Sequence, residues 1–148
     1  MSPITLKYAG VMLLAGVGIP ILATLNARLG ARIGAPAVAA TLVFSVALVA
    51  GVAAVLLTTG FGPTARLAGQ PPYLFSAGLF MAFYVLSVTI IAPKFGVGNA
   101  IFCVLLGQMI SATIIDHFGL GAATHPLDLT RGAGLALMAG GLFLILKG

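Results

Sequence analysis

Five apolar segments, each long enough to cross a lipid bilayer, dominate this sequence. None of them contains more than one charged residue. A hydrocarbon core of about 30 Å requires about 20 apolar residues in a helix. We therefore expect an all-α integral membrane protein that forms a single membrane domain, residues 1–148, with five transmembrane helices. Their approximate limits are 8–27, 37–58, 73–92, 97–116 and 130–146.

Composition excludes several other classes of protein. Hydrophobic residues make up 61% of the chain and charged residues 6%, whereas a soluble domain has roughly 45–50% and 25%. The basic residues form no run that would indicate nucleic-acid binding. Cys103 is the only cysteine, so neither a disulfide framework nor a thiolate metal site is expected. Lys7 precedes the first apolar segment, which we interpret as a retained helix and not a signal peptide.

The basic residues are divided almost equally between the two faces of the membrane. If the chain crosses the bilayer five times, one face receives Lys7, Arg66 and Arg131, and the other receives Arg28, Arg32, Lys94 and Lys147. Membrane proteins are oriented by an excess of Lys and Arg on one side. Near balance therefore predicts dual topology, in which the same chain inserts both ways. The alternatives are that Arg28 and Arg32 fix one orientation, or that the chain pairs with an oppositely inserted homologue.

An odd number of spans gives dual topology a structural consequence. Two antiparallel copies reproduce the inverted repeat on which many transporters are built. We expect an antiparallel homodimer of ten helices, or a pair with a homologous subunit. A stripe of small residues in the last helix, Gly132, Ala136 and Gly140, is the candidate for close packing in this dimer.

The first helix contains a glycine and proline motif near the bilayer midplane. Pro20 lacks an amide hydrogen and crowds the carbonyl of Gly16, so we expect the helix to kink or open there, with Gly18 easing the distortion. The motif is either an ordinary kink or the wall of a binding cavity. Asn26, near the end of this span, is expected to tie down the following loop or to cap the helix.

Polar side chains recur at the same depth in three other helices. Ser45 lies near the centre of the second span, Tyr84 and Ser87 share a face of the third, and Gln108 and Ser111 share a face of the fourth. A buried amide without partners is costly, so Gln108 must face protein or water and not lipid. These residues either line a substrate cavity or form ordinary bonds between helices.

An adjacent acidic and basic pair, Asp116 and His117, closes the fourth span. Placement at the membrane interface avoids most of the cost of a buried charge. The pair is either a polar helix end that bonds to Arg131 or a loop amide, or a gate that senses protons. Asp128 is placed to cap the last helix. The spacing of these residues with His125 matches no metal-binding motif, so no metal and no cofactor is expected.

Four stretches resemble the YdcZ-type branch of the drug/metabolite transporter superfamily, and together they extend the resemblance over essentially the whole chain. They read GVGIPILATLNARLG, APKFGVGNA, GQMISATIIDHFGLG and HPLDLTRGAGLALMAGG. The resemblance implies a multi-pass protein of the bacterial inner membrane that works as an antiparallel homodimer, as a paired heterodimer or in fused form. It implies transport, without an assigned substrate.

Individual residues fit the pattern of this family. Gln108 lies in its Gly-Gln motif, Asp116 and Gly119 lie in its Asp-x-Phe-Gly motif, and Asn26 lies in its Asn-x-x-Leu ending of the first helix. One departure is that relatives often carry a glutamine just past the midplane of the first helix, where this chain has the segment 20–22, Pro-Ile-Leu. The similar small multidrug exporters use a carboxylate within the membrane, but this chain has no acidic residue near any midplane.

The sequence thus predicts a transporter of a small organic solute, and not an enzyme, that works by alternating access in an antiparallel dimer. The partners expected are the second copy, the lipid bilayer and the solute. Two alternatives remain, a small dual-topology channel and a membrane subunit that transports nothing. Substrate, coupling ion and direction are left open.

Overall fold

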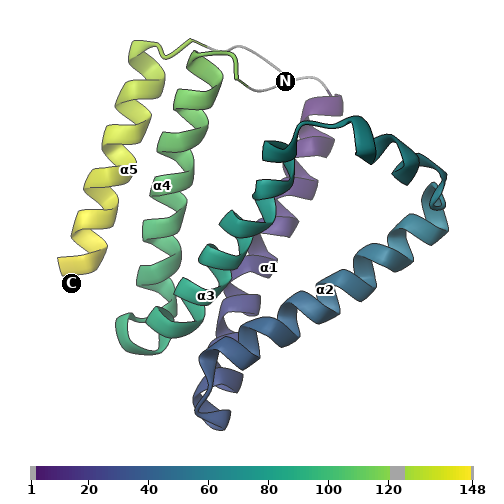
Figure 1. Ribbon diagram of the computed structural model, residues 1–148. Coiled ribbons are helices and arrows are strands. Elements are labelled where there is room, and N and C mark those ends of the chain that lie inside the picture. The colour runs from purple at the N-terminus through teal and green to yellow at the C-terminus, as the bar shows by residue number, and fades with distance from the viewer. Residues whose placement is uncertain (1–2, 121–125, 148) are drawn as a thin grey trace. The chain divides into compact units, whose positions relative to one another are not determined.

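All secondary structure in the computed structural model, which describes residues 3–120 and 126–147, is helical (Figure 1). Two short 3-10 helices, η1 (Gly62–Gly69) and η2 (Pro72–Ser76), connect the second long helix to the third. Five helices are long and apolar enough to cross a membrane, which confirms the all-α class and the predicted number of spans. The long helices are α1 (Pro3–Ile33), α2 (Pro36–Thr58), α3 (Ala77–Phe95), α4 (Val97–His117) and α5 (Leu129–Lys147).

The first helix is longer than the apolar segment that predicts it. α1 has 31 residues and continues beyond Asn26 to Ile33, which corresponds to about 46 Å at 1.5 Å per residue. The stretch from Lys7 to Arg28 alone is about 30 Å long, close to the thickness of the hydrocarbon core. We therefore expect the two cations to lie near the two edges of the bilayer, with the last turns of α1 beyond the apolar core.

The turn that ends α1 depends on glycine. Gly34 has a φ of +64°, in the left-handed region that glycine adopts without the strain of a Cβ. The amide of Ala35 donates to the carbonyl of Gly30 at 3.1 Å, and Pro36 begins α2, where a missing amide hydrogen costs nothing. This short turn places the end of α1 beside the start of α2.

The chain divides into two compact units, Met1–Lys94 and Phe95–Gly148. In the first unit the second half of α1 packs against the start of α2 and the last turns of α3. The buried apolar residues there are mostly small, which allows the helix backbones to approach closely. They are Ala23, Ala27, Ala39, Ala40, Val85, Val88 and Ala92.

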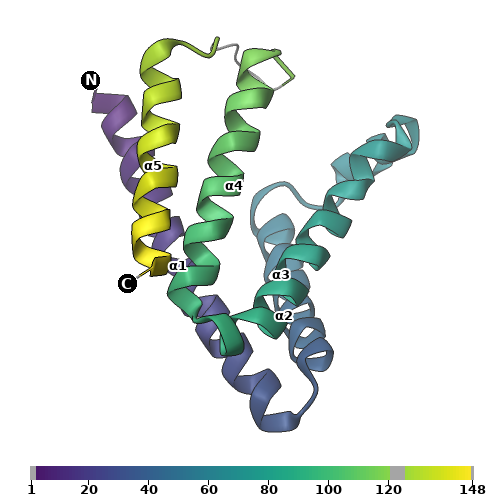
Figure 2. The same ribbon diagram turned by 90° about the vertical axis from the view of Figure 1, so that its left-hand side faces the viewer.

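α1 and α2 are close together only near their shared turn. Away from it the two helices diverge, as both views show (Figures 1 and 2). The small residues Ala39 and Ala40 are fully buried at the start of α2, whereas Val46 and Ala50 further along it are exposed. The divergence leaves an open groove between the two helices.

The second unit is a pair of helices. α4 and α5 lie side by side and run in opposite directions (Figure 1). Ala100 near the start of α4 and Leu142 near the end of α5 are buried.

Candidate functional site

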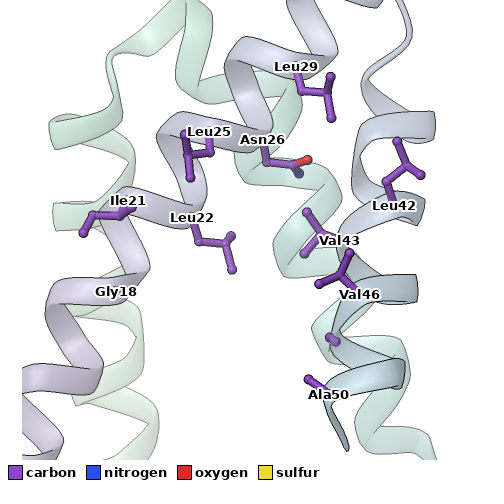
Figure 3. A pocket seen from close by; sticks show the side chains of 11 residues that line it. Gly18, Ile21, Leu22, Leu25, Asn26, Leu29, Leu42, Val43, Val46 and Ala50 are labelled. Carbon is purple, nitrogen blue, oxygen red and sulfur yellow. The ribbon is translucent and has the colours of Figure 1, made fainter.

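The first unit contains a groove between α1 and α2, hereafter the α1–α2 groove (Figure 3). Its volume is about 530 Å³, within the range of about 300–1,000 Å³ that is typical of sites for small molecules. None of the described residues that line it is charged. Aliphatic side chains from both helices form most of the lining, including Leu22, Leu25 and Leu29 of α1 and Leu42, Val43 and Val46 of α2.

Asn26 is the polar residue in this lining, and it also joins α1 to α3. The residue is buried, with only 3% of its surface exposed. The amide Nδ2 donates a hydrogen bond of 2.5 Å to Oγ1 of Thr89. Asn26 therefore lies inside α1 and binds a neighbouring helix, in place of the loop contact or helix cap that we expected from the sequence.

The contact with Thr89 determines which way the Asn26 carboxamide faces. The Thr89 hydroxyl donates to the carbonyl of Val85 at 2.6 Å, so its one hydrogen is already used. Its oxygen can then only accept, and the Asn26 nitrogen must face it. The other end of the carboxamide, Oδ1, is buried and has no hydrogen-bond partner among the described residues.

A buried carbonyl oxygen without a donor is unfavourable. The desolvation of such a group costs about 1–3 kcal/mol, and such groups are rare enough that each one calls for an explanation. Here the unpaired oxygen belongs to a residue that lines an apolar groove in a pair of membrane-length helices. This combination of an apolar surface and one unused acceptor is suited to binding a ligand.

The predicted cavity residues of α1 are only partly associated with this groove. Gly18 lines it, whereas Pro20 lines a separate recess of about 250 Å³ together with Thr24. A Cβ added at Gly16 would meet nothing within 4 Å. α1 stays helical through Pro20, so the helix does not open there, and Thr24 donates a hydrogen bond of 2.8 Å to the Pro20 carbonyl.

The predicted polar residues of α2 and α3 do not line the α1–α2 groove. Ser45 is exposed and donates to the carbonyl of Thr41 in its own helix at 3.0 Å. Tyr84 and Ser87 are half-buried. The Tyr84 hydroxyl is buried and has no partner among the described residues, so it is a second unused polar group in the first unit.

Gln108 and Ser111 belong to the second unit. Both are exposed on α4, and the Gln108 side chain makes no hydrogen bond within the described part of this unit. That these two residues share a cavity with Ser45, Tyr84 and Ser87 stays a prediction.

The end of α4 carries a cluster of polar contacts. Asp116 Oδ2 lies 3.4 Å from a guanidinium nitrogen of Arg131, and both side chains are more than one-third exposed. The backbone amide of Leu127 donates to Nδ1 of His117 at 3.1 Å. Oδ1 of Asp128 accepts from the amide of Arg131 at 2.7 Å, the capping of α5 that the sequence predicts. This is the geometry of a polar helix end, and a gating role for Asp116 and His117 stays a prediction.

The same cluster borders a hollow of about 420 Å³ between α4 and α5. Asp116 and Arg131 lie on its rim, and Met109, Leu135 and Met138 form apolar walls. The polar groups there are already paired, unlike Oδ1 of Asn26. His125, which we considered with this cluster, lies outside the described residues.

The small-residue stripe of α5 is not covered. Gly132 is half-buried, and Ala136 and Gly140 are exposed. A Cβ added at either glycine would meet nothing within 4 Å. The stripe is free to pack against another helix, and its place in a dimer stays a prediction.

Thr89 is the residue that sequence reasoning missed. It lies 63 positions from Asn26, and no motif links the two. The only indication in the sequence that Thr89 has a structural role is weak. It is a hydroxyl in an apolar helix, where it can bond to the carbonyl four residues earlier.

The helices described above are enough to assign a general class of protein. Five helices long and apolar enough to cross a membrane identify a multi-pass membrane protein.

The family follows from residues 8–144, which match the family described as "Putative inner membrane exporter, YdcZ". The chain belongs to this family, and the resemblance noted in the sequence is confirmed. The family name places its members in the inner membrane and describes them as exporters. No curated protein and no solved structure was found to match the chain.

Proposed function

We propose that this protein exports a small organic solute across the bacterial inner membrane. The family is described as one of exporters, which gives the class of activity. The observation that supports it best is the α1–α2 groove, an apolar hollow of about 530 Å³ with a buried and unpaired carbonyl oxygen from Asn26. A structural subunit would gain nothing from an acceptor left without a donor.

We further propose that the working unit is an antiparallel dimer that acts by alternating access. The near-equal numbers of Lys and Arg on the two faces support insertion in both orientations. Exposure of Gln108 on α4 supports a cavity shared by two copies, because an amide facing lipid would be costly. In such a dimer, Gln108 and Ser111 face Tyr84, Ser87 and Ser45 across a central path, with the segment 16–20 as its flexible wall.

The test is the accumulation of a panel of radiolabelled small organic solutes in bacteria that overproduce the protein. We expect a lower cellular level of at least one solute, and a return to the level of empty cells for Gln108→Leu. Ile110→Leu, an apolar change on the same helix, is the matched control and should behave like the unchanged protein. Cross-linking should show that both variants still form dimers.

Two outcomes would count against this function. Equal accumulation of every solute with and without the protein would indicate a subunit that transports nothing. A steady ionic current in planar bilayers, insensitive to Gln108→Leu, would indicate a channel.

A further inference from the structure

We propose that the α1–α2 groove binds a neutral amphipathic molecule whose hydroxyl or amide N–H group donates a hydrogen bond to Oδ1 of Asn26. The apolar part of this molecule lies along the groove toward Gly18 (Figure 3). The identification of this ligand as the exported solute rests on the proposed function. The binding itself does not.

The requirement for a donor follows from the way Asn26 is held. Thr89 uses its hydroxyl hydrogen on the Val85 carbonyl and accepts from the Asn26 nitrogen. Turning the carboxamide would direct its oxygen at Thr89, and Thr89 could donate to it only by giving up its own bond to the Val85 carbonyl. With these bonds in place Asn26 presents an acceptor, and a donor satisfies it.

The requirement for neutrality follows from the lining. No described residue of the groove carries a charge, and an ion moved from water into such surroundings without a counter-charge is strongly disfavoured. A single amide oxygen does not replace the hydration shell of an ammonium group.

The depth of Asn26 sets the shape of the ligand. Asn26 lies one helical turn or less from Arg28, which matches the edge of the hydrocarbon core, whereas Gly18 lies near the midplane. The distance between Gly18 and Asn26 along α1 is about 12 Å. The ligand thus has its polar group near the membrane surface and an apolar part of about this length directed inward, as an amphipathic molecule lies in one leaflet.

A purely apolar occupant of the groove would leave Asn26 unsatisfied. An apolar helix face from a second copy offers no donor, because its backbone amides are already bonded within the helix. A lipid acyl chain has no donor at all. Because Oδ1 is buried, we expect neighbouring leucine side chains to move when the ligand binds.

The test compares three small molecules that share one apolar body. They are 4-biphenylmethanol, which has a hydroxyl donor, its methyl ether, which has none, and 4-biphenylmethylamine, which is cationic at neutral pH. Binding to the purified full chain in lipid nanodiscs is measured by isothermal titration calorimetry, with the heat from empty nanodiscs subtracted. We expect the alcohol to bind about three- to tenfold more tightly than the ether, the range of one net hydrogen bond, and more tightly than the amine.

Two variants distinguish the effect of the Asn26 acceptor on binding from the effect of the hydrogen bond between Asn26 and Thr89. Asn26→Leu removes both, and should bring the ratio of alcohol to ether affinity to about one while the ether still binds. Thr89→Val breaks the same contact between α1 and α3 but keeps the Asn26 carboxamide, whose oxygen is then no longer held in place, so it should reduce the preference for the alcohol without abolishing it. Binding of the ether to Asn26→Leu shows that the groove of this variant is folded.

The proposal is overturned if the ether or the amine binds the unchanged protein as tightly as the alcohol does, if Asn26→Leu keeps the preference, or if none of the three molecules binds. These outcomes are distinguishable from failure of the export function. A preference that depends on Asn26, without any effect of the protein on solute accumulation, would refute export and leave the binding site standing. Solute export by a protein that shows no such preference would refute the binding site alone.

Discussion

Asn26 and Thr89 form a polar contact in a core that otherwise consists of small apolar side chains. Both are almost completely buried, with 3% and 2% of their surface exposed. Thr89 is satisfied by two hydrogen bonds, whereas Asn26 keeps one unused acceptor. At the scale of residues, Asn26 is therefore both a structural link and the most distinctive polar feature of the groove.

This arrangement predicts an unequal response to the removal of either partner. Thr89→Val leaves the Asn26 nitrogen buried without an acceptor, and we expect a loss of about 1–3 kcal/mol of stability. Asn26→Leu leaves the Thr89 hydroxyl still bonded to the Val85 carbonyl, so we expect a small change or a gain. Thermal unfolding in detergent measures both.

The double variant provides the decisive comparison. Asn26→Leu combined with Thr89→Val removes both polar groups and should restore most of the stability that Thr89→Val loses, because replacing both partners with apolar groups of similar shape is nearly neutral. If the effects of the two single substitutions on stability simply add, the contact between Asn26 and Thr89 is not the cause of the loss in Thr89→Val.

At the scale of helices, close approach at one end and separation at the other produce the groove. Gly30 lies where α1 and α2 are closest. A Cβ added there would lie 3.1 Å from Cα of Pro36 and 3.3 Å from Cγ2 of Thr89. Glycine at this position allows α1 to contact both neighbouring helices at once.

We therefore expect Gly30→Val to destabilise the first unit. Its extra methyl groups have to displace the backbone at Pro36, and overpacking of this kind typically costs about 1–3 kcal/mol. Gly10→Val is the matched control, because a Cβ at Gly10 meets nothing within 4 Å. Thermal unfolding should show a clearly lower midpoint for Gly30→Val than for Gly10→Val, and equal midpoints would show that the α1–α2 contact is not tight.

The polar contacts at the end of α4 join it to the start of α5. The ion pair between Asp116 and Arg131 is more than one-third exposed on both sides, so its contribution is limited to about 0–1 kcal/mol. The cap from Asp128 to the Arg131 amide contributes about 1 kcal/mol on its own. The helix cap is thus at least as important as the ion pair for the start of α5.

At the scale of the whole molecule, the balance of cations supports insertion in both orientations. If the chain crosses the bilayer five times, three Lys and Arg residues fall on one face and four on the other. An orientation rule that depends on Lys and Arg asymmetry then favours neither strongly. The proposed antiparallel dimer depends on this balance.

Labelling from the two sides of the membrane tests the prediction of dual topology. Cys103 is exposed and is first replaced with alanine, and Leu67→Cys is then introduced beside Arg66 without changing the charge. An impermeant maleimide should label about half of the molecules in intact cells and the remainder in inverted vesicles. Labelling from one side only would exclude the antiparallel homodimer.

A variant with one added positive charge tests whether the cations determine the orientation of the chain. Gln70→Lys adds a cation to the loop that contains Arg66 and should increase the fraction of molecules in which this loop is cytoplasmic. An unchanged ratio would show that the cations do not determine the orientation.

The sequence by itself determined the class of protein, the number of spans and the family. Those properties depend on the apolar composition of continuous segments, because a helix in lipid satisfies its backbone internally and each span can be recognised alone. The capping of α5 by Asp128 was also predictable, since a cap acts over three residues.

Only the tertiary structure decided how the polar residues are used. Ser45 turned out to bond within its own helix, and Asn26 turned out to bind Thr89 and to line a groove. Depth along a helix can be counted from a sequence, but the direction in which a side chain points relative to other helices depends on how those helices pack. In this chain that packing is set by small residues such as Ala39 and Gly30, which bring three helices together at one end and leave α1 and α2 apart at the other.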